Sequence, residues 1–206
     1  ESAIFLNGLR LLDPFHIRDF NNIFSSIDGR AISGVEAYTG GFPAIYGNRM
    51  SGVLVLQSKS PEQLRRHELG ISVFNTSALT SGFSREGKLD WLVSARRSNL
   101  ALVLNETEHG QPDYNDIFAT LGINQSDDTR LTLNVLRASD DILAITEHLA
   151  DDREQSVSKT LNEHFWLQME HRWSPQLEMN AVLSSSTLHH QRRALVNSPG
   201  QQVGFV

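Results

Sequence analysis

The residues that most invite a chemical interpretation form a glycine-rich segment at positions 40–53, with the sequence GGFPAIYGNRMSGV. Glycine-rich loops bind phosphate when their glycines follow a fixed pattern before a helix, and the ATP-binding version ends in Gly-Lys-Ser/Thr. Neither pattern occurs here. Backbone geometry explains the segment better, because glycine adopts positive φ and a proline such as Pro43 stiffens a loop.

Histidine is the second residue type that could do chemistry, as a metal ligand or a proton acceptor. His189 and His190 are adjacent and would point to opposite faces of a strand, and neither they nor His16 belongs to a His-Glu-x-x-His pattern. The chain has no cysteine, which excludes thiolate metal sites and thiol nucleophiles, and it has no nucleophile elbow. We therefore predict no metal, no cofactor and no enzymatic activity.

The charge of the chain narrows the class of partner. Its 206 residues include 18 Lys and Arg and 24 Asp and Glu, for a formal net charge of −6. The basic residues are scattered, whereas a nucleic-acid-binding protein usually clusters them on one face, so we expect no nucleic-acid partner. The longest apolar run, residues 100–104, is much shorter than a membrane-spanning helix requires.

The elements that would position these residues are mainly β-strands. From residue 67 onward, apolar and polar residues alternate with period two in six stretches, and a weaker seventh lies at about Ser77–Ser84. The six stretches are residues 69–73, 89–95, 116–124, 131–136, 164–170 and 177–184. We predict about seven antiparallel strands.

The connections between these strands are of two kinds. Tight turns are predicted at Arg85–Lys88, Ser126–Thr129 and Ser174–Gln176, and long polar connections at about Ser98–Pro112 and Ser139–Ser158. We expect the second, acidic connection to be a solvated loop with some helical content. Short turns at one end and long loops at the other are typical of outer-membrane barrels, but a soluble sandwich with its apolar face inward would alternate in the same way.

Residues 1–60 differ from the rest. Strands are predicted at residues 3–6, 35–38 and 53–56, with a turn at Asn7-Gly8 and a short amphipathic piece around Ile17 to Ile23. This mixture predicts a small α/β or mostly β unit. Residues 61–66 are polar, begin with a proline and are predicted to be a linker.

Residues 40–53 resemble the end of the plug domain in TonB-dependent outer-membrane receptors. Further similarity covers residues 6–9 (LNGL) and 13–16 (DPFH), and residues 91–98 (WLVSARRS) and 112–116 (PDYND) are similar to early barrel strands in the branch with a carboxypeptidase-regulatory-like N-terminal domain. The resemblance implies a mainly β chain: residues 1–60 would be the C-terminal part of a small α/β plug domain, 61–66 the linker, and 67–206 the first strands of an incomplete transmembrane β-barrel. The TonB box would lie before Glu1, and about seven strands are too few for the roughly 22-stranded barrels of such transporters.

The function implied by this resemblance is energised import of a scarce nutrient across the cell outer membrane of a Gram-negative envelope. The implied partners are a TonB-type energy-transducing protein, outer-membrane lipid and lipopolysaccharide, and a small ligand that the sequence does not name.

The resemblance also implies roles for individual residues. Plug arginines would meet acidic side chains on the inner wall of the barrel, whereas the ordinary alternative is a solvated surface arginine. Trp91 and Trp173, near tight turns, would belong to an aromatic girdle or else to an ordinary core. The expected plug-loop residues are Gly40, Gly41, Pro43, Tyr46, Gly47, Arg49 and Gly52, and the ion-pair candidates are Arg49, Arg96, Asp116, Glu170 and Glu178.

Two other interpretations stay open at this point. A soluble all-β module that binds a ligand or partner would bury the apolar face of the predicted sheet. An outer-membrane barrel without a plug would leave residues 1–60 packed outside the barrel.

Overall fold

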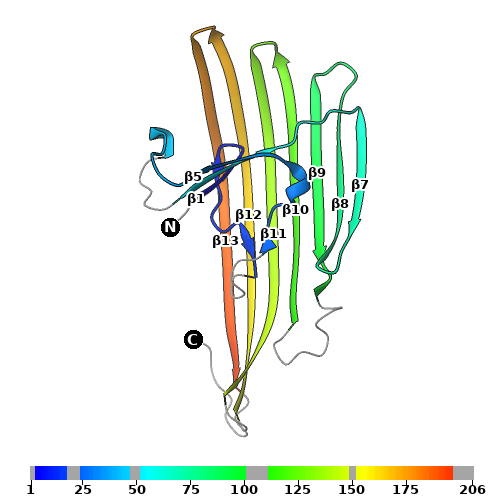
Figure 1. The fold of residues 1–206 in the computed structure, drawn as a ribbon, viewed down its shortest axis with the longest axis vertical. Helices are drawn as coiled ribbons and strands as arrows, with labels where there is room; N and C mark the ends of the chain where they lie inside the picture. Colours follow the sequence, from blue (N-terminus) through cyan, green and yellow to red (C-terminus); the bar gives the residue numbers. More distant parts are fainter. Residues whose placement is uncertain (1–2, 18–23, 47–51, 101–110, 149–151, 197–206) are drawn as a thin grey trace.

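The computed structural model describes residues 3–17, 24–46, 52–100, 111–148 and 152–196, and these residues are mainly β (Figure 1). They form one large sheet, one small sheet and a two-stranded ribbon. The helical elements described in full are two short 3₁₀ turns, η2 (Gly29–Ala31) and η3 (Ala44–Tyr46), and Leu100, at the end of one described range, is also helical. In the same ranges no helix is both long and apolar enough to cross a membrane.

The large sheet is a seven-stranded antiparallel meander in which each strand pairs with its neighbours in the chain, so β7 and β13 are its edges in the described part. The prediction of seven antiparallel strands is confirmed, and the sheet is open rather than closed into a barrel. The strands are β7 (Arg65–Ile71), β8 (Asn75–Phe83), β9 (Leu89–Ser98), β10 (Gln111–Ser126), β11 (Thr129–His148), β12 (Asp152–Ser174) and β13 (Leu177–Val196).

The prediction of a long loop at about Ser139–Ser158 is wrong. The ladder between β11 and β12 runs without a register shift from Thr129 beside His171 to His148 beside Asp152, so most of the supposed loop is strand. The alternation of polar and apolar side chains fades in this stretch, but the backbone hydrogen bonds of a hairpin need no apolar side chains. These strands therefore extend well past the apolar part of the sheet.

The small sheet has the order β2-β1-β6-β5, with β1 parallel to β6 and the other pairs antiparallel. Its strands are β1 (Ala3–Leu6), β2 (Leu9–Arg10), β5 (Ile32–Tyr38) and β6 (Val53–Ser58). Asn7 and Gly8 have φ values of 44° and 78° and form the predicted two-residue turn, for which Asn-Gly is the favoured pair.

A separate ribbon pairs β3 (Phe15–His16) with β4 (Phe24–Ser25). The described part of residues 1–60 contains no α-helix, so the α/β character expected for this unit is replaced there by a mixed sheet and 3₁₀ turns. The amphipathic piece predicted around Ile17 to Ile23 lies outside the described residues except for Ile17.

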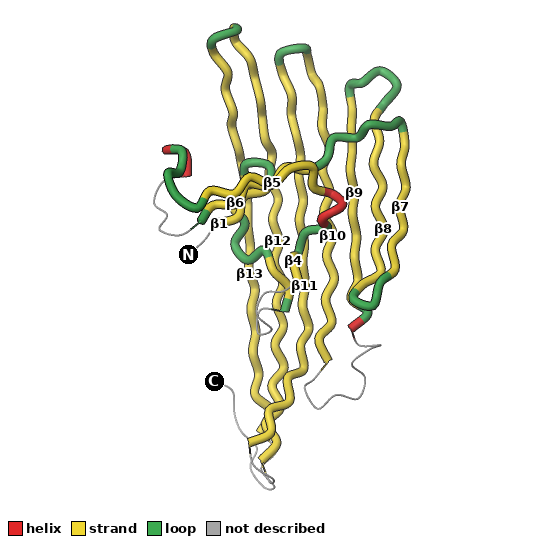
Figure 2. The backbone as a smooth tube through the Cα atoms, in the orientation of Figure 1, coloured by secondary structure: helices red, strands yellow, loops and turns green. Residues whose placement is uncertain are grey.

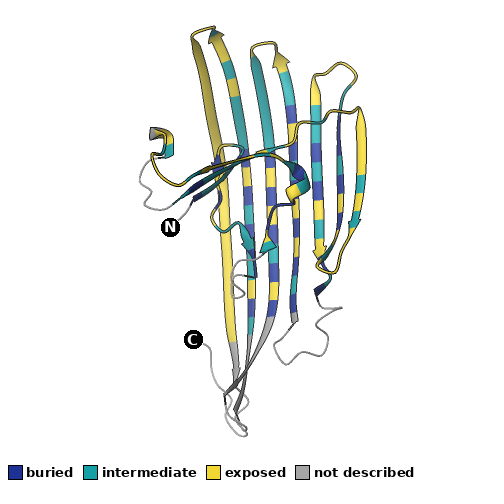
Figure 3. Cartoon of the chain, in the orientation of Figure 1, coloured by how far each residue is buried: buried dark blue, intermediate teal, exposed yellow. Residues whose placement is uncertain are grey.

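The small sheet lies across the middle of the large one, on one face only (Figures 1 and 2). We call the covered face of the large sheet the inner face and the opposite one the outer face. Along β8–β12 buried and exposed side chains alternate (Figure 3), as the period-two pattern requires. The inner face contributes Leu79, Leu92, Phe118, Leu136 and Trp166, one from each of these strands, to a core shared with Leu6, Leu9, Leu11, Ile27 and Ala31.

Outside the core shared with the N-terminal residues, the aliphatic and aromatic side chains of the large sheet lie mostly on the outer face, and many of them are exposed. Phe165 is 50% exposed, Leu183 74% and Trp173 66%. The opposite parity holds Ser94, Asp116, Asn134, Asp140 and His164 together with the apolar residues of the shared core, and it is the side that the N-terminal residues cover. This distribution is the reverse of a soluble sandwich, which turns its apolar face inward.

Candidate functional site

The interface between the N-terminal residues and the inner face contains a buried charged cluster centred on His16. Its Nδ1 lies 2.6 Å from Oδ1 of Asp140 on β11, and its Nε2 lies 3.0 Å from Oδ2 of Asp116 on β10. His16 is fully buried, and the two carboxylates are almost so. The imidazole also stacks on Tyr114, with ring centroids 4.4 Å apart.

Arg96 on β9 completes this cluster. Its Nε donates to both oxygens of Asp116 at 3.0 Å, and its Nη2 lies 2.9 Å from the same carboxylate. Nη2 also donates to the carbonyl oxygen of Ser25 at 2.6 Å, so one guanidinium joins the large sheet to the β3–β4 ribbon. Four ionisable groups, from three strands and the ribbon, thus meet around the fully buried His16, and of the four only the Arg96 side chain, at 12%, is exposed by more than a tenth.

A second polar contact lies at the start of the small sheet's η2 turn. The Asp28 carboxylate accepts from the backbone N–H of Arg30 at 2.9 Å, from Nη2 of Arg30 at 2.7 Å and from Oγ of Ser94 on β9 at 2.9 Å. Burial alone would raise the pKa of Asp28, but the hydrogen bonds from Arg30 and Ser94 outweigh it and lower the pKa below the ordinary value.

The Asn7-Gly8 turn makes the third contact. Nδ2 of Asn7 donates to Oδ1 of Asn134 on β11 at 2.8 Å, and its backbone carbonyl accepts from the indole Nε1 of Trp166 on β12 at 3.1 Å. The Asn7 side chain also bonds Ser58 at the end of β6. The buried indole therefore both fills the shared core and holds the tip of the turn on the large sheet.

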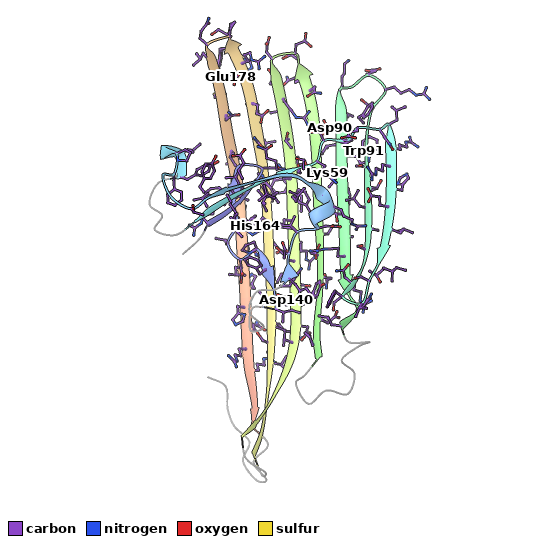
Figure 4. The ribbon with its side chains drawn as sticks, viewed as in Figure 1. Lys59, Asp90, Trp91, Asp140, His164 and Glu178 are labelled. Atoms are coloured by element: carbon purple, nitrogen blue, oxygen red, sulfur yellow. The ribbon has the colours of Figure 1, made fainter. Side chains whose placement is uncertain are left out.

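Among the predicted ion-pair residues, Arg96 and Asp116 lie in this interface, but they pair with each other across adjacent strands. Their contacts with the N-terminal residues are the Ser25 carbonyl and His16. Glu178 pairs with Arg172 at 2.9 Å within the β12–β13 hairpin and lies near the tight-turn end of the sheet, away from the small sheet (Figure 4). Glu170 is exposed and accepts from Gln168.

The predicted plug loop is described only in part, because Gly47 and Arg49 lie outside the described residues. Gly40, Gly41 and Pro43 are exposed, and a Cβ at either glycine would meet no described atom within 4 Å, so close packing is not what requires glycine there. Gly41 has a φ of 63°, which fits the backbone-geometry interpretation. Tyr46 packs on Phe5 and Tyr38, and the carbonyl of Gly52 accepts from the N–H of Ala3.

The two girdle candidates lie on the outer face toward the tight-turn end. Trp91 lies over Gly82 of the neighbouring strand, and Figure 4 places it above the level of the small sheet. Trp173 is 66% exposed and meets His171 edge to face, with ring centroids 4.5 Å apart.

Three residues that hold the interface were not singled out as site residues from the sequence: His16, Asp28 and Asn7. Each contacts residues of the large sheet that lie 66 to 159 positions away, so no local sequence pattern predicts it. His190 and Thr160 form an exposed pair at 3.0 Å, and no described group of three or more His, Cys, Asp or Glu residues has a geometry that would hold a metal ion.

No protein-family model matches this sequence, and no curated protein matches it either.

Proposed function

We propose that this chain is the gate and part of the wall of a TonB-dependent outer-membrane transporter, which imports a scarce nutrient when an energy-transducing partner acts on the gate. In this proposal residues 3–58 belong to the plug, and β7–β13 are wall strands with lipid on the outer face and the plug on the inner face. Nothing is chemically transformed, because the interface holds and releases a domain.

The observation that carries the proposal is the polarity of the two faces. The N-terminal residues dock on the inner face, which contains the polar residues Asp116, Asn134 and Asp140. The outer face, with its aliphatic and aromatic side chains, stays exposed. A lipid-facing barrel wall has this arrangement, with apolar residues outward and polar residues toward the lumen. A soluble module would leave a large apolar surface in water.

The extent of the apolar outer face agrees with a membrane. On β12 it runs from Phe165 to Trp173, with His171 as a polar residue next to its end, and these eight residue steps cover about 26 Å at about 3.3 Å per residue, close to the apolar band of about 25 Å on outer-membrane barrels. Beyond Phe165, outer-face ion pairs join Arg137 to Glu163 and Lys159 to Asp141. Charged pairs are placed there as expected for strands that leave the hydrocarbon and continue into water.

The position of the N-terminal residues supports a plug over a barrel without one. They lie against the inner face through apolar clusters, hydrogen bonds and ion pairs, and the outer face is free of them in the described residues (Figures 1 and 3). A β7 edge and a β13 edge remain open for further wall strands.

A matched pair of neighbours on β13 tests the proposal. The chain has no cysteine, so a thiol introduced at Leu183 or at Ser184 reports one face each. In isolated outer membranes of cells that make the full-length protein, we expect Leu183→Cys to react with a lipid-soluble maleimide and to resist a membrane-impermeant one. Ser184→Cys should react with the membrane-impermeant maleimide and resist the lipid-soluble one. Recovery of the protein in the soluble fraction, or equal labelling of both thiols by the impermeant reagent, would refute the membrane wall.

The gating part needs a separate readout. Ser26 belongs to the docked N-terminal residues, directly after β4, and is fully buried. In energised cells, we expect Ser26→Cys to react faster with a thiol reagent than in cells treated with an uncoupler, because the partner would pull on the plug. Equal labelling rates in the two conditions would refute the proposal of an energised gate. They would not affect the proposal that β7–β13 form a membrane wall.

A further inference from the structure

The hydrogen bonds of His16 constrain its protonation state. Both ring nitrogens face carboxylate oxygens, at 2.6 Å and 3.0 Å, and an ionised carboxylate can only accept. Asp116 already accepts from the Arg96 guanidinium on both of its oxygens, which fixes it as a carboxylate. The arrangement is therefore satisfied when both imidazole nitrogens donate, which is the imidazolium form.

We propose that His16 is a protonation-dependent latch, whose imidazolium bridges Asp116 and Asp140 and holds the β3–β4 ribbon on the wall, and whose deprotonation loosens the ribbon. The inference rests on the proposed function, in which this ribbon belongs to the gate. It adds a proton as the regulator of that gate.

Charge balance explains why losing the proton matters. Around His16, β9 presents Arg96, β10 presents Asp116 and the stacked Tyr114, and β11 presents Asp140. With imidazolium present, two positive groups face two negative ones. Without it, two buried carboxylates share one guanidinium, and one ring nitrogen faces a carboxylate without a proton to donate, which is costly in a site closed to water.

The remaining neighbours do not replace the lost charge. β12 presents Asn162, which donates to the carbonyl of Asp13 at 2.7 Å, and His164, which lies 2.8 Å from Oγ of Ser186. Asp13, in the segment leading to β3, is a further acidic residue. The two residues of β4, Phe24 and Ser25, carry no ionisable side chain.

The ribbon has its own apolar contacts, separate from those of the small sheet. Ile17 packs with Leu100, Tyr114 and Ile142, and Phe24 lies against this cluster. Ile17 also has a φ of 54°, a conformation that is strained for a β-branched residue and that only surrounding contacts maintain. Loosening the latch would relax this strain without separating the core beneath the small sheet.

The direction of the pH effect follows from the same contacts. Burial alone lowers the pKa of His16, but the hydrogen bonds to Asp116 and Asp140 and their charges outweigh it and raise the pKa above the ordinary value. A raised pKa in the docked state means that the contribution to docking is complete below about pH 6.5, the unperturbed value for histidine. It is lost as the pH rises through the docked-state pKa.

The test uses the full-length protein in outer membranes, with one introduced thiol. Ser26→Cys is the reporter, because Ser26 is buried, its N–H donates to the carbonyl of Pro14 beside the latch, and its Oγ has no hydrogen-bond partner among the described residues. Ser60→Cys, at an exposed position, supplies the reference. The ratio of the two labelling rates with a methanethiosulfonate reagent, taken from pH 6 to pH 9, cancels the intrinsic ionisation of the thiol.

We expect this ratio to rise at least tenfold with pH when His16 is present, and to be high and independent of pH in His16→Gln. His164→Gln, a buried histidine outside the cluster, should keep the rise. A flat ratio with His16 present, or the same rise in His16→Gln, would overturn the latch. If His16→Gln does not fold, Asp140→Asn serves instead: it should move the midpoint to lower pH, and an unchanged midpoint overturns the latch. These outcomes leave the labelling of Leu183→Cys and Ser184→Cys unaffected, so failure of the latch and failure of the transporter proposal are distinguishable.

Discussion

Two glycines of the large sheet provide a matched test of how tightly its side chains are packed. A Cβ at Gly82 on β8 would meet the backbone carbonyl oxygen of Leu64 and would lie 2.6 Å from Cζ2 of Trp91. A Cβ at Gly122 on β10 would meet Nη2 of Arg130 and would lie 2.5 Å from Oδ2 of Asp90. Both sites are crowded, but the atoms in the way differ in how freely they can move.

At Gly82 the obstacles are a backbone oxygen and a large ring, so Gly82→Ala should force the strands or Trp91 to shift, at an overpacking cost of about 1–3 kcal/mol. At Gly122 the obstacles are the ends of two long side chains. Gly122→Ala should only displace the Arg130–Asp90 ion pair, which is partly solvated and contributes about 0–1 kcal/mol. Neither glycine has a positive φ, so alanine also gains about 0.4–1 kcal/mol at each through the unfolded chain.

We therefore expect Gly82→Ala to destabilise the protein by about 1–2 kcal/mol more than Gly122→Ala. The measurement is urea unfolding of the protein refolded into lipid vesicles, followed by tryptophan fluorescence, with both variants compared with the parent. Trp91 emission should also shift in Gly82→Ala and remain unchanged in Gly122→Ala. An equal decrease in the free energy of unfolding in both variants, or a larger decrease for Gly122→Ala, would refute the close packing of Trp91 on Gly82.

Two further changes test the docking contacts. Trp166→Phe removes the indole N–H that donates to the carbonyl of Asn7 and should weaken docking by about 1–3 kcal/mol, seen as faster labelling of Ser26→Cys at pH 6. Asp28→Asn should lower the urea midpoint at pH 7, because it removes the charge that holds Arg30. The pKa of Asp28 is lowered in the folded protein, so its contribution to the free energy of unfolding is complete above about pH 3.9 and is lost as the pH falls through the folded-state pKa. The difference in urea midpoint between Asp28→Asn and the parent should therefore shrink under strongly acidic conditions.

The sequence predicted the large sheet well where one face is apolar. Stretches such as residues 116–124 and 164–170 lie within β10 and β12, because side-chain alternation there reflects two different environments. The same rule missed the far halves of β11 and β12. Where polar residues occupy both faces, alternation disappears while the hydrogen-bonded ladder continues, and acidic residues mixed with Ile142 and Ile145 resembled a helical loop.

The interface was predictable only from the wall side. Parity placed Arg96 and Asp116 on the polar face, and there they lie. Their partner could not be predicted in the same way, because His16 lies in a two-residue strand with no motif and meets carboxylates 100 and 124 residues away. Long-range pairing of this kind depends on where the N-terminal residues pack on the inner face of the large sheet, and the local sequence does not encode that position.

The composition of the interface has a consequence for gating. A plug held only by apolar surface would lose the whole hydrophobic contribution when it moves into a water-filled lumen. Here the apolar contact beneath the small sheet is one row of side chains, a second and smaller apolar cluster lies beneath the ribbon, and hydrogen bonds and ion pairs make the other contacts; the row consists of Leu79, Leu92, Phe118, Leu136 and Trp166. Water can replace polar bonds at a small net cost, about 0.5–1.5 kcal/mol for each ordinary hydrogen bond. In the proposed transporter, the polar contacts would therefore position the plug, and the apolar row together with the buried charge balance at His16 would set the free energy that the energised partner must supply.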